Sequence, residues 1–337
     1  MPLQLIQVGL GAHGLGVAQS DVLMAQDFTF CGIVDIDESR LRQASQLLQV
    51  EPAQCYTDYK TAFTQGGADA VYITAASPFH YDICKCALEE NLHVLVEKPF
   101  VTEIDQGKEL VAIAKRKGLK LMVDQNYRWV KSVLTLKREI GRQALGEPMF
   151  VDAKFFYSHE GKPYQRQMQD YMLFEMGIHH IDMMRFLFDE NIHTVRGRTW
   201  NTPGSGYLGD PHVYAVYELD GGMPIFYIGS LLTQGLSSPW EGQWRVQCTK
   251  GSIHLDDLGA GYGVYLVNEV QEAAKVDDVI PKHESIRGVL AEFADAILHD
   301  RAPLSSGEDN LLTLAALNAT SDSSRDGKAC CPMDYLQ

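Results

Sequence analysis

The chain has 337 residues, 45% of them hydrophobic, which is enough for one large domain or two moderate ones, and we expect two. The formal net charge of -15, with no basic block to offset it, argues against nucleic acid or a membrane surface as a partner. No run of about 18 apolar residues could span a bilayer, and the N-terminus lacks the features of a signal peptide. Seven scattered cysteines predict reduced thiols in a cytoplasmic protein, not a disulfide framework or a zinc site.

The stretch from Leu3 to Gly14, LQLIQVGLGAHG, predicts a strand, a tight turn and the start of a helix, with glycines at G-x-G-x-x-G spacing. Gly9 allows the sharp turn, Gly11 leaves room for a pyrophosphate, and Gly14 lets the helix pack closely on the strand. The N–H groups at the helix start favour an anion. The alternative is a turn without a ligand, since glycines often follow strands.

A second strand-like run, Phe28 to Asp35, ends in an acid 21 residues beyond Gly14. Near this spacing, a carboxylate accepts hydrogen bonds from the adenosine ribose of a dinucleotide. Because an acid there would repel a 2′-phosphate, we expect NAD to be preferred over NADP.

Helix-like and strand-like pieces then alternate, which is typical of a parallel sheet with crossover helices. We expect helices at Asp37 to Leu48, Asp58 to Thr64, Pro78 to Glu90, and from a Thr102 cap to Lys117 with Gly118 closing it, and strands at Ala70 to Thr74, His93 to Val96 and Lys120 to Val123.

Two polar segments follow expected strands and therefore lie at the carboxyl edge of the sheet, where open α/β folds bind ligands. The first is Glu97-Lys98-Pro99, whose alternative is an ordinary strand-to-loop junction with a solvated lysine. The second runs from Gln125 to Arg128, and it could equally be a polar connection between domains.

The rhythm changes near residues 118 to 148, so we expect a first domain over 1–125 and a second over 126–337, with the last helices free to pack back on the first. The second domain should hold a mostly antiparallel sheet. Its expected strands are Ile192 to Asn201, Val213 to Leu219, Ile225 to Leu232, Trp244 to Thr249, Ser252 to Leu255 and Val264 to Val267, and its last helices are Glu284 to His299 and Glu308 to Ser324.

The segment from Tyr171 to Phe188 is apolar nearly all round if helical, so it should be buried. Glu175, His179 and Asp182 fall at i, i+4 and i+7 and would share one face. They form either a core histidine satisfied by two carboxylates or a general base tuned by them. His180 points about 100° away and is expected to pack or cap, and no metal site is expected because adjacent helical positions face apart.

Together these stretches resemble the glucose-fructose oxidoreductase, inositol dehydrogenase and rhizopine-catabolism family of NAD(P)-dependent oxidoreductases. The resemblance spans the chain through GLGAHG, IVDIDESR, HVLVEKPF, GIHHIDMMRFLF, CTKGSIHLDD and SSGEDN. It implies a Rossmann domain followed by an α/β domain whose large open sheet forms homodimers or homotetramers.

The resemblance also implies roles in oxidising a secondary hydroxyl of a sugar, cyclitol or sugar derivative. Lys98 would bind the substrate oxygen and His179, beside Glu175, would take the hydroxyl proton while hydride passes to NAD. The expected cofactor contacts are Gly9, Gly11, Ala12, His13, Gly14, Asp35, Ala76, Ser77, Glu97, Lys98 and Gln125. The expected substrate contacts are Arg128, Tyr157, Glu175 and His179, with His159, Tyr164 and Arg166 as further candidates.

Two departures from the family pattern bear on the substrate. Glu175 stands where many family members carry aspartate, and TAASPFHYD has Phe79 and Asp82 where asparagine and histidine are usual. The alternatives are an NAD-using glycosidase, which works by oxidation, elimination and re-reduction, and a non-catalytic dinucleotide-binding regulator. Retention of Lys98 and His179 argues against the regulator.

Overall fold

The computed structural model describes all residues, 1–337, and the chain divides into two compact units. The first unit comprises Met1–Trp129 and Lys282–Leu311, and the second comprises Val130–Pro281 and Leu312–Gln337. Helix α9, Gly307–Asp326, carries the chain from the first unit into the second.

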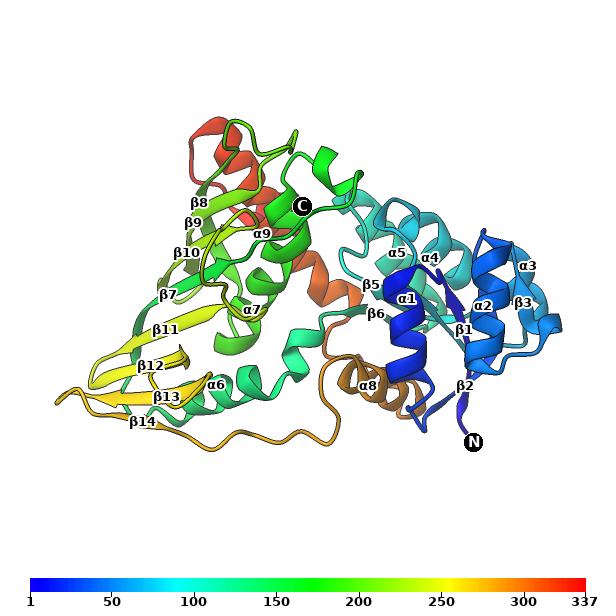
Figure 1. Cartoon of the computed structure of the whole chain (residues 1–337), viewed down its shortest axis with the longest axis horizontal. Helices are drawn as coiled ribbons and strands as arrows, with labels where there is room; N and C mark the ends of the chain where they lie inside the picture. The colour runs from blue at the N-terminus through cyan, green and yellow to red at the C-terminus, as the bar shows by residue number, and fades with distance from the viewer. The chain divides into compact units, whose positions relative to one another are not determined.

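The first unit is built on a six-stranded parallel sheet in the order β3-β2-β1-β4-β5-β6 (Figure 1). Its strands are β1 Leu3–Val8, β2 Phe28–Val34, β3 Cys55–Tyr56, β4 Ala70–Ile73, β5 His93–Glu97 and β6 Leu121–Asp124. This order reverses direction between β1 and β4, which is where a doubly wound sheet opens its ligand crevice. The Rossmann prediction is confirmed.

The helical segments of the first unit follow the expected alternation. They are α1 Ala12–Val17, the π turn η1 Ala18–Val22, α2 Glu38–Leu48, η2 Pro52–Gln54, α3 Tyr59–Gln65, η3 Ser77–Phe79, α4 His80–Glu89, α5 Ile104–Lys117, η4 Asn126–Trp129 and α8 Ile286–Leu298. Asp37 and Asp58 accept backbone N–H groups at the starts of α2 and α3, as N-caps do. The expected Thr102 cap is wrong, because α5 follows Glu103 and has no side-chain cap.

Helix α8 completes one side of this sheet although it lies far along the chain. Leu5, Tyr72 and Met122 of the sheet pack in one core with Val289 and Phe293 of α8. An amphipathic pattern predicts that such a helix is half-buried but not which sheet it covers.

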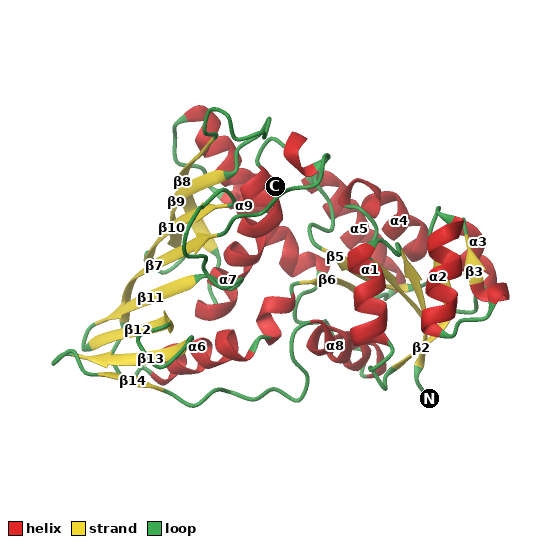
Figure 2. Cartoon of the chain, in the orientation of Figure 1, coloured by secondary structure: helices red, strands yellow, loops and turns green.

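The second unit is built on an eight-stranded sheet in the order β14-β13-β12-β11-β7-β10-β9-β8 (Figure 2). Its strands are β7 Pro148–Phe156, β8 Ile192–Trp200, β9 His212–Leu219, β10 Pro224–Ser230, β11 Gln243–Cys248, β12 Gly251–Asp256, β13 Gly263–Asn268 and β14 Ala273–Lys275. All pairs are antiparallel except β7 with β10, which confirms the expected second sheet. Strand β7 and helix α6, Lys131–Arg142, had no counterpart in our expectations.

Helices cover one face of this sheet. Besides α6 and α9 they are the π turn η6 Leu173–Gly177 and α7 Ile178–Phe188, with short turns η5 Gln165–Gln167 and η7 Pro332–Tyr335. On the other face apolar side chains stay exposed, namely Phe150, Tyr214, Val216 and Phe226. No helix is both long and apolar enough to cross a membrane, and all seven cysteines are free thiols.

Candidate active site

Two glycines of the glycine-rich turn after β1 are required by close backbone contacts, and the third faces open space. Gly9 has φ +97°, and a Cβ there would lie 2.5 Å from the nitrogen of Ala75. A Cβ on Gly14 would lie 2.1 Å from the carbonyl oxygen of Gly9, whereas one on Gly11 would meet nothing within 4 Å. The backbone at Gly11 thus faces open space that a diphosphate could approach.

A buried polar brace holds this turn against β4. The Gln7 side-chain amide donates to the Gly14 carbonyl at 2.7 Å and to the Thr74 hydroxyl at 3.1 Å. Thr74 in turn donates to the Gly9 carbonyl at 2.6 Å. The turn is therefore fixed before any ligand arrives, which lowers the ordering cost of binding.

The Asp35 carboxylate lies just beyond β2 and is 6% exposed. One oxygen accepts the backbone N–H of Leu10 at 2.7 Å and the other that of Asp37 at 3.0 Å, and Arg40 approaches at 3.7 Å. Each carboxylate oxygen keeps a second lone pair. The group is therefore both tied to the glycine-rich turn and able to accept a ribose hydroxyl.

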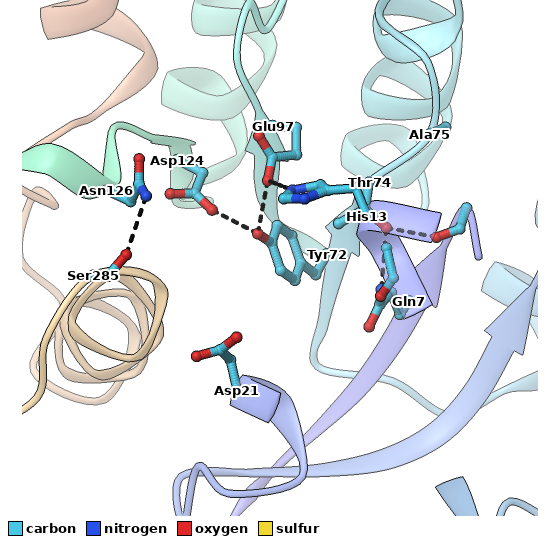
Figure 3. Close-up of polar contacts among 12 residues, drawn as sticks. Gln7, His13, Asp21, Tyr72, Thr74, Ala75, Glu97, Asp124, Asn126 and Ser285 are labelled. Atoms are coloured by element: carbon cyan, nitrogen blue, oxygen red, sulfur yellow. Dashed lines mark hydrogen bonds and ion pairs between the residues drawn. The ribbon is translucent and has the colours of Figure 1, made fainter. Parts of the chain in front are cut away.

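Four side chains form a linked cluster at the ends of β5 and β6 (Figure 3). The His13 ring Nε2 lies 2.8 Å from Glu97 Oε1. The Tyr72 hydroxyl lies 2.5 Å from Asp124 and 3.2 Å from Glu97. Burial and the charge of Glu97 raise the pKa of Asp124 well above its usual range.

His80 is a polar residue at this edge that the sequence analysis did not single out. It is 1% exposed, and its two ring nitrogens lie 2.9 Å from the Ala75 carbonyl and 2.8 Å from the Pro99 carbonyl. It thereby ties the segment containing Ala76 and Ser77 to the segment containing Lys98. A polar residue in the first turn of a helix gave no signal for this bridge.

The remaining cofactor candidates also lie at this edge. Lys98 is half-buried directly after β5, and Gln125 follows β6 with only 1% exposed. The side-chain oxygen and nitrogen of Gln125 are buried and make no hydrogen bond within the chain. A buried amide of this kind requires a partner, which a bound cofactor would supply.

Arg128 lies in the first unit and is held by the chain itself. Its guanidinium donates to the Leu304 carbonyl and to the Asp309 carboxylate, both at 2.6 Å. A substrate contact by Arg128 stays a prediction.

In the second unit, the expected uninterrupted α-helix around His179 is wrong. Leu173 to Gly177 form a π turn, and the α-helix begins at Ile178. A π turn holds more residues than an α-helical turn, so the spacing of four between Glu175 and His179 does not carry its α-helical meaning. Such turns occur frequently at functional sites.

The side chains of α7 divide between packing and the candidate site. His180 is fully buried, with Nδ1 2.7 Å from the Tyr227 hydroxyl and Nε2 3.1 Å from the Trp240 carbonyl, which confirms its packing role. His179 is 7% exposed, and the Asp182 carboxylate accepts a hydrogen bond from Thr313 at 3.1 Å.

The other substrate candidates lie on the segment that follows strand β7. His159 lies 2.6 Å from the Tyr171 hydroxyl, and the rings of Tyr157 and Trp240 are tilted to each other with centroids 4.4 Å apart. Burial, together with the nearby charge of Glu175, raises the pKa values of Tyr164 and Tyr171.

Arg166 is also on this loop, where it donates to the Gly161 carbonyl at 2.8 Å and pairs with Glu160 at 2.7 Å. No group of three or more histidine, cysteine, aspartate or glutamate side chains is arranged to hold a metal ion.

Each of the two units contains a match to a known family model. Residues 5–125 match the family described as "Oxidoreductase family, NAD-binding Rossmann fold", and residues 133–254 match the "GFO/IDH/MocA C-terminal domain". The two matches cover well over half of the chain. The chain therefore belongs to the Gfo/Idh/MocA family of NAD-binding oxidoreductases, which confirms the resemblance seen in the sequence.

Among the relatives, a D-apiose dehydrogenase of Paraburkholderia graminis is 23% identical over 88% of this chain and 81% of its own length. An inositol 2-dehydrogenase of Salmonella paratyphi B is 28% identical over 55% of this chain and 56% of its own. Among solved structures, an Agrobacterium radiobacter oxidoreductase in complex with NAD+, L-tartaric acid and magnesium has a TM-score of 0.89 at 21% identity, over 99% of both chains.

Proposed function

We propose that this protein oxidises a secondary hydroxyl of a sugar, cyclitol or sugar derivative, reversibly, with NAD as hydride acceptor. The observation that carries the proposal is the carboxyl edge of the six-stranded sheet. There the open glycine-rich turn, the Asp35 carboxylate and Lys98 lie at the ends of strands β1, β2 and β5. The two dehydrogenases among the relatives support a polyhydroxy substrate.

Bound NAD would supply the hydride acceptor, and the chain's residues would supply binding and proton transfer. The backbone at Gly9, Gly11 and Gly14 would hold the diphosphate. Lys98 would bind the reacting oxygen, where its ammonium stabilises developing negative charge. The His179 imidazole would take the hydroxyl proton, a task for which a group titrating near neutral pH is suited.

Glu175 and Asp182 lie near His179 in sequence and would influence its basicity and orientation. Asp182 is itself fixed by Thr313, so its carboxylate is held in place. Glu175 would contact the substrate directly, together with Tyr157.

Asp35 supports a preference for NAD over NADP. Its carboxylate is buried and held by two backbone N–H groups, so it could not move aside for a 2′-phosphate without losing both. A 2′-phosphate there would place a second anion beside the carboxylate, and like charges this close repel each other.

We also propose that the exposed apolar face of the eight-stranded sheet joins copies of the chain into a homodimer or homotetramer. Phe150 and Phe226 lie on this face with ring centroids 6.3 Å apart, and exposed apolar patches of this kind mark association sites. The free thiols fit the reducing cytoplasm.

The test is NADH absorbance on mixing the purified protein and NAD with a panel of aldoses, inositols and sugar acids, beside binding titrations of NAD and NADP. We expect steady NADH production with a member of this panel and tighter binding of NAD. Binding of NAD without NADH production would contradict the dehydrogenase proposal. Cleavage of glycosides in the same sample would then favour the glycosidase chemistry.

A further inference from the structure

His13 places a titratable side chain inside the glycine-rich turn, two residues from Gly11. Its Nε2 lies 2.8 Å from Glu97, and its side chain is 57% exposed whereas that of Glu97 is 13% exposed. The last residue of β5 is thus joined to the first turn of α1 by a contact that is strong only when the imidazole is charged.

Tyr72 and Asp124, which are linked to Glu97, determine which carboxyl of the cluster carries the negative charge. The Tyr72 hydroxyl lies between the two carboxyls and has one proton to donate, and Asp124 Oδ1 is buried with no partner. Two carboxyls this close cannot both ionise readily. Because burial raises the pKa of Asp124 and His13 lowers that of Glu97, Glu97 carries the charge.

Other charged groups face the cluster from each neighbouring element. Lys98 from the end of β5 opposes protonation of His13, whereas Asp124 from β6 favours it only to the extent that its carboxyl is ionised. His80 from α4 acts on Glu97, and Asp21 from the turn after α1 acts on Asp124. The hydrogen bond to Glu97 is the largest influence, and the pKa of His13 is raised.

We propose that the His13 imidazolium, held by Glu97, is a charged binding determinant for the diphosphate of the dinucleotide, so that NAD binds more tightly when His13 is protonated. This inference rests on the proposed function, because it concerns the same NAD site. The backbone at Gly11 faces open space only two residues away. A positive charge two residues from this space would attract a bound diphosphate, because charges within the Debye length of about 10 Å are only partly screened.

The direction of the pH dependence follows from the linkage between proton binding and NAD binding. A bound anion favours the imidazolium, so NAD binding takes up a proton wherever free His13 is partly neutral. Affinity is therefore highest below the pKa of free His13 and decreases as the pH rises through the pKa of the bound form. Dinucleotide sites without a titrating group would show no such slope.

The experiment is calorimetric titration of NAD and of ADP-ribose between about pH 5.5 and about pH 9, where an imidazole titrates. We expect the Kd of both ligands to rise about tenfold across this range, as for loss of one partly exposed charge contact. ADP-ribose keeps the diphosphate and lacks the nicotinamide. A slope with NAD but not with ADP-ribose would overturn the assignment to the diphosphate.

Two substitutions separate charge from shape. His13→Gln keeps a donor for Glu97 without a charge, and should bind weakly with no pH slope. His13→Arg keeps a permanent charge, and should bind tightly with no slope. His299→Gln is the matched control, because His299 also pairs with a carboxylate, Asp295, at 3.0 Å on helix α8, and it should retain the wild-type slope.

Proton uptake by the unmodified protein gives a readout that needs no variant. The heat of NAD binding near neutral pH should differ between buffers of different ionisation enthalpy, by the amount expected for fractional proton uptake. NAD binding with no pH slope and no proton uptake would overturn this inference and leave the proposed function intact. Absence of NAD binding at every pH would instead overturn the proposed function.

Discussion

The glycine-rich turn of the first unit and helix α7 of the second would carry the two halves of the proposed chemistry, and their geometries have different origins. In the turn, Gly9 and Gly14 are required by backbone atoms that lie within 2.5 Å of the Cβ positions they lack. In α7, the surroundings of His180 and Asp182 come from Tyr227 and Thr313, which are 47 and 131 residues away along the chain. Backbone requirements can be predicted from the local sequence, whereas the tertiary partners of a side chain cannot.

The largest change in activity is expected for a substitution in helix α7. His179→Ala should lower kcat by at least about a hundredfold, as loss of a general base does, and leave the Kd of NAD nearly unchanged. Steady-state kinetics and NAD titration measure the two quantities. His193→Ala is a control, because His193 is exposed on β8 beside Asp220 and should change neither. Full turnover in His179→Ala would rule out the assigned base.

A second substitution tests the turn. Gly14→Ala should lower the free energy of unfolding by about 2 kcal/mol, since its Cβ would overlap the Gly9 carbonyl and one of the two must move. Gly16→Ala in the same helix is the control. It meets nothing within 4 Å and should be neutral or stabilising by up to about 1 kcal/mol. Chemical unfolding of both variants decides, and equal effects would contradict the close-packing role of Gly14.

The difference between local backbone requirements and distant tertiary partners also explains how much of the fold and of the candidate site the sequence could predict. Five of the six strands of the first sheet, β1, β2, β4, β5 and β6, follow from local pattern and are present in the structure, whereas the two-residue strand β3 was not expected. The π turn at Leu173–Gly177 leaves no trace in a hydrophobic pattern that stays apolar all round, so an uninterrupted α-helix was expected there.

Contacts between residues far apart in the sequence could not be predicted, because no local pattern marks them. His80 is bound by the carbonyls of Ala75 and Pro99, and every residue type offers a carbonyl, so no side-chain motif marks the contact. Helix α8 was predicted as a helix, but its packing on the first sheet depends on shape rather than pattern. The candidate site could therefore be located by strand ends, while its supporting contacts could not.

A third prediction concerns the buried acid in the first unit. The pKa of Asp124 is raised on folding, so the proton it holds stabilises the fold below the ordinary aspartate pKa, and this contribution is lost as the pH rises toward the raised value. Asp124→Asn should remove this decrease in stability with rising pH, because asparagine does not titrate. The wild type should weaken relative to the variant by up to about 1.4 kcal/mol per pH unit above about pH 4. Urea unfolding at several pH values measures it, and parallel curves would show that Asp124 does not titrate abnormally.

The smallest effect is expected for the preference between NAD and NADP, which we assign to the Asp35 carboxylate at the end of β2. Asp35→Asn keeps an acceptor for the Leu10 N–H but removes the charge that would repel a 2′-phosphate, and it leaves Arg40 nearby to pair with one. The ratio of kcat/KM for NAD over NADP should fall about tenfold, the size expected for one screened charge contact. Asp37→Asn is the matched control, because Asp37 is a neighbouring carboxylate that caps α2, and asparagine caps helices equally well. If both variants changed the ratio equally, the preference would reflect the net charge of the region and not the carboxylate that the glycine-rich turn holds in place.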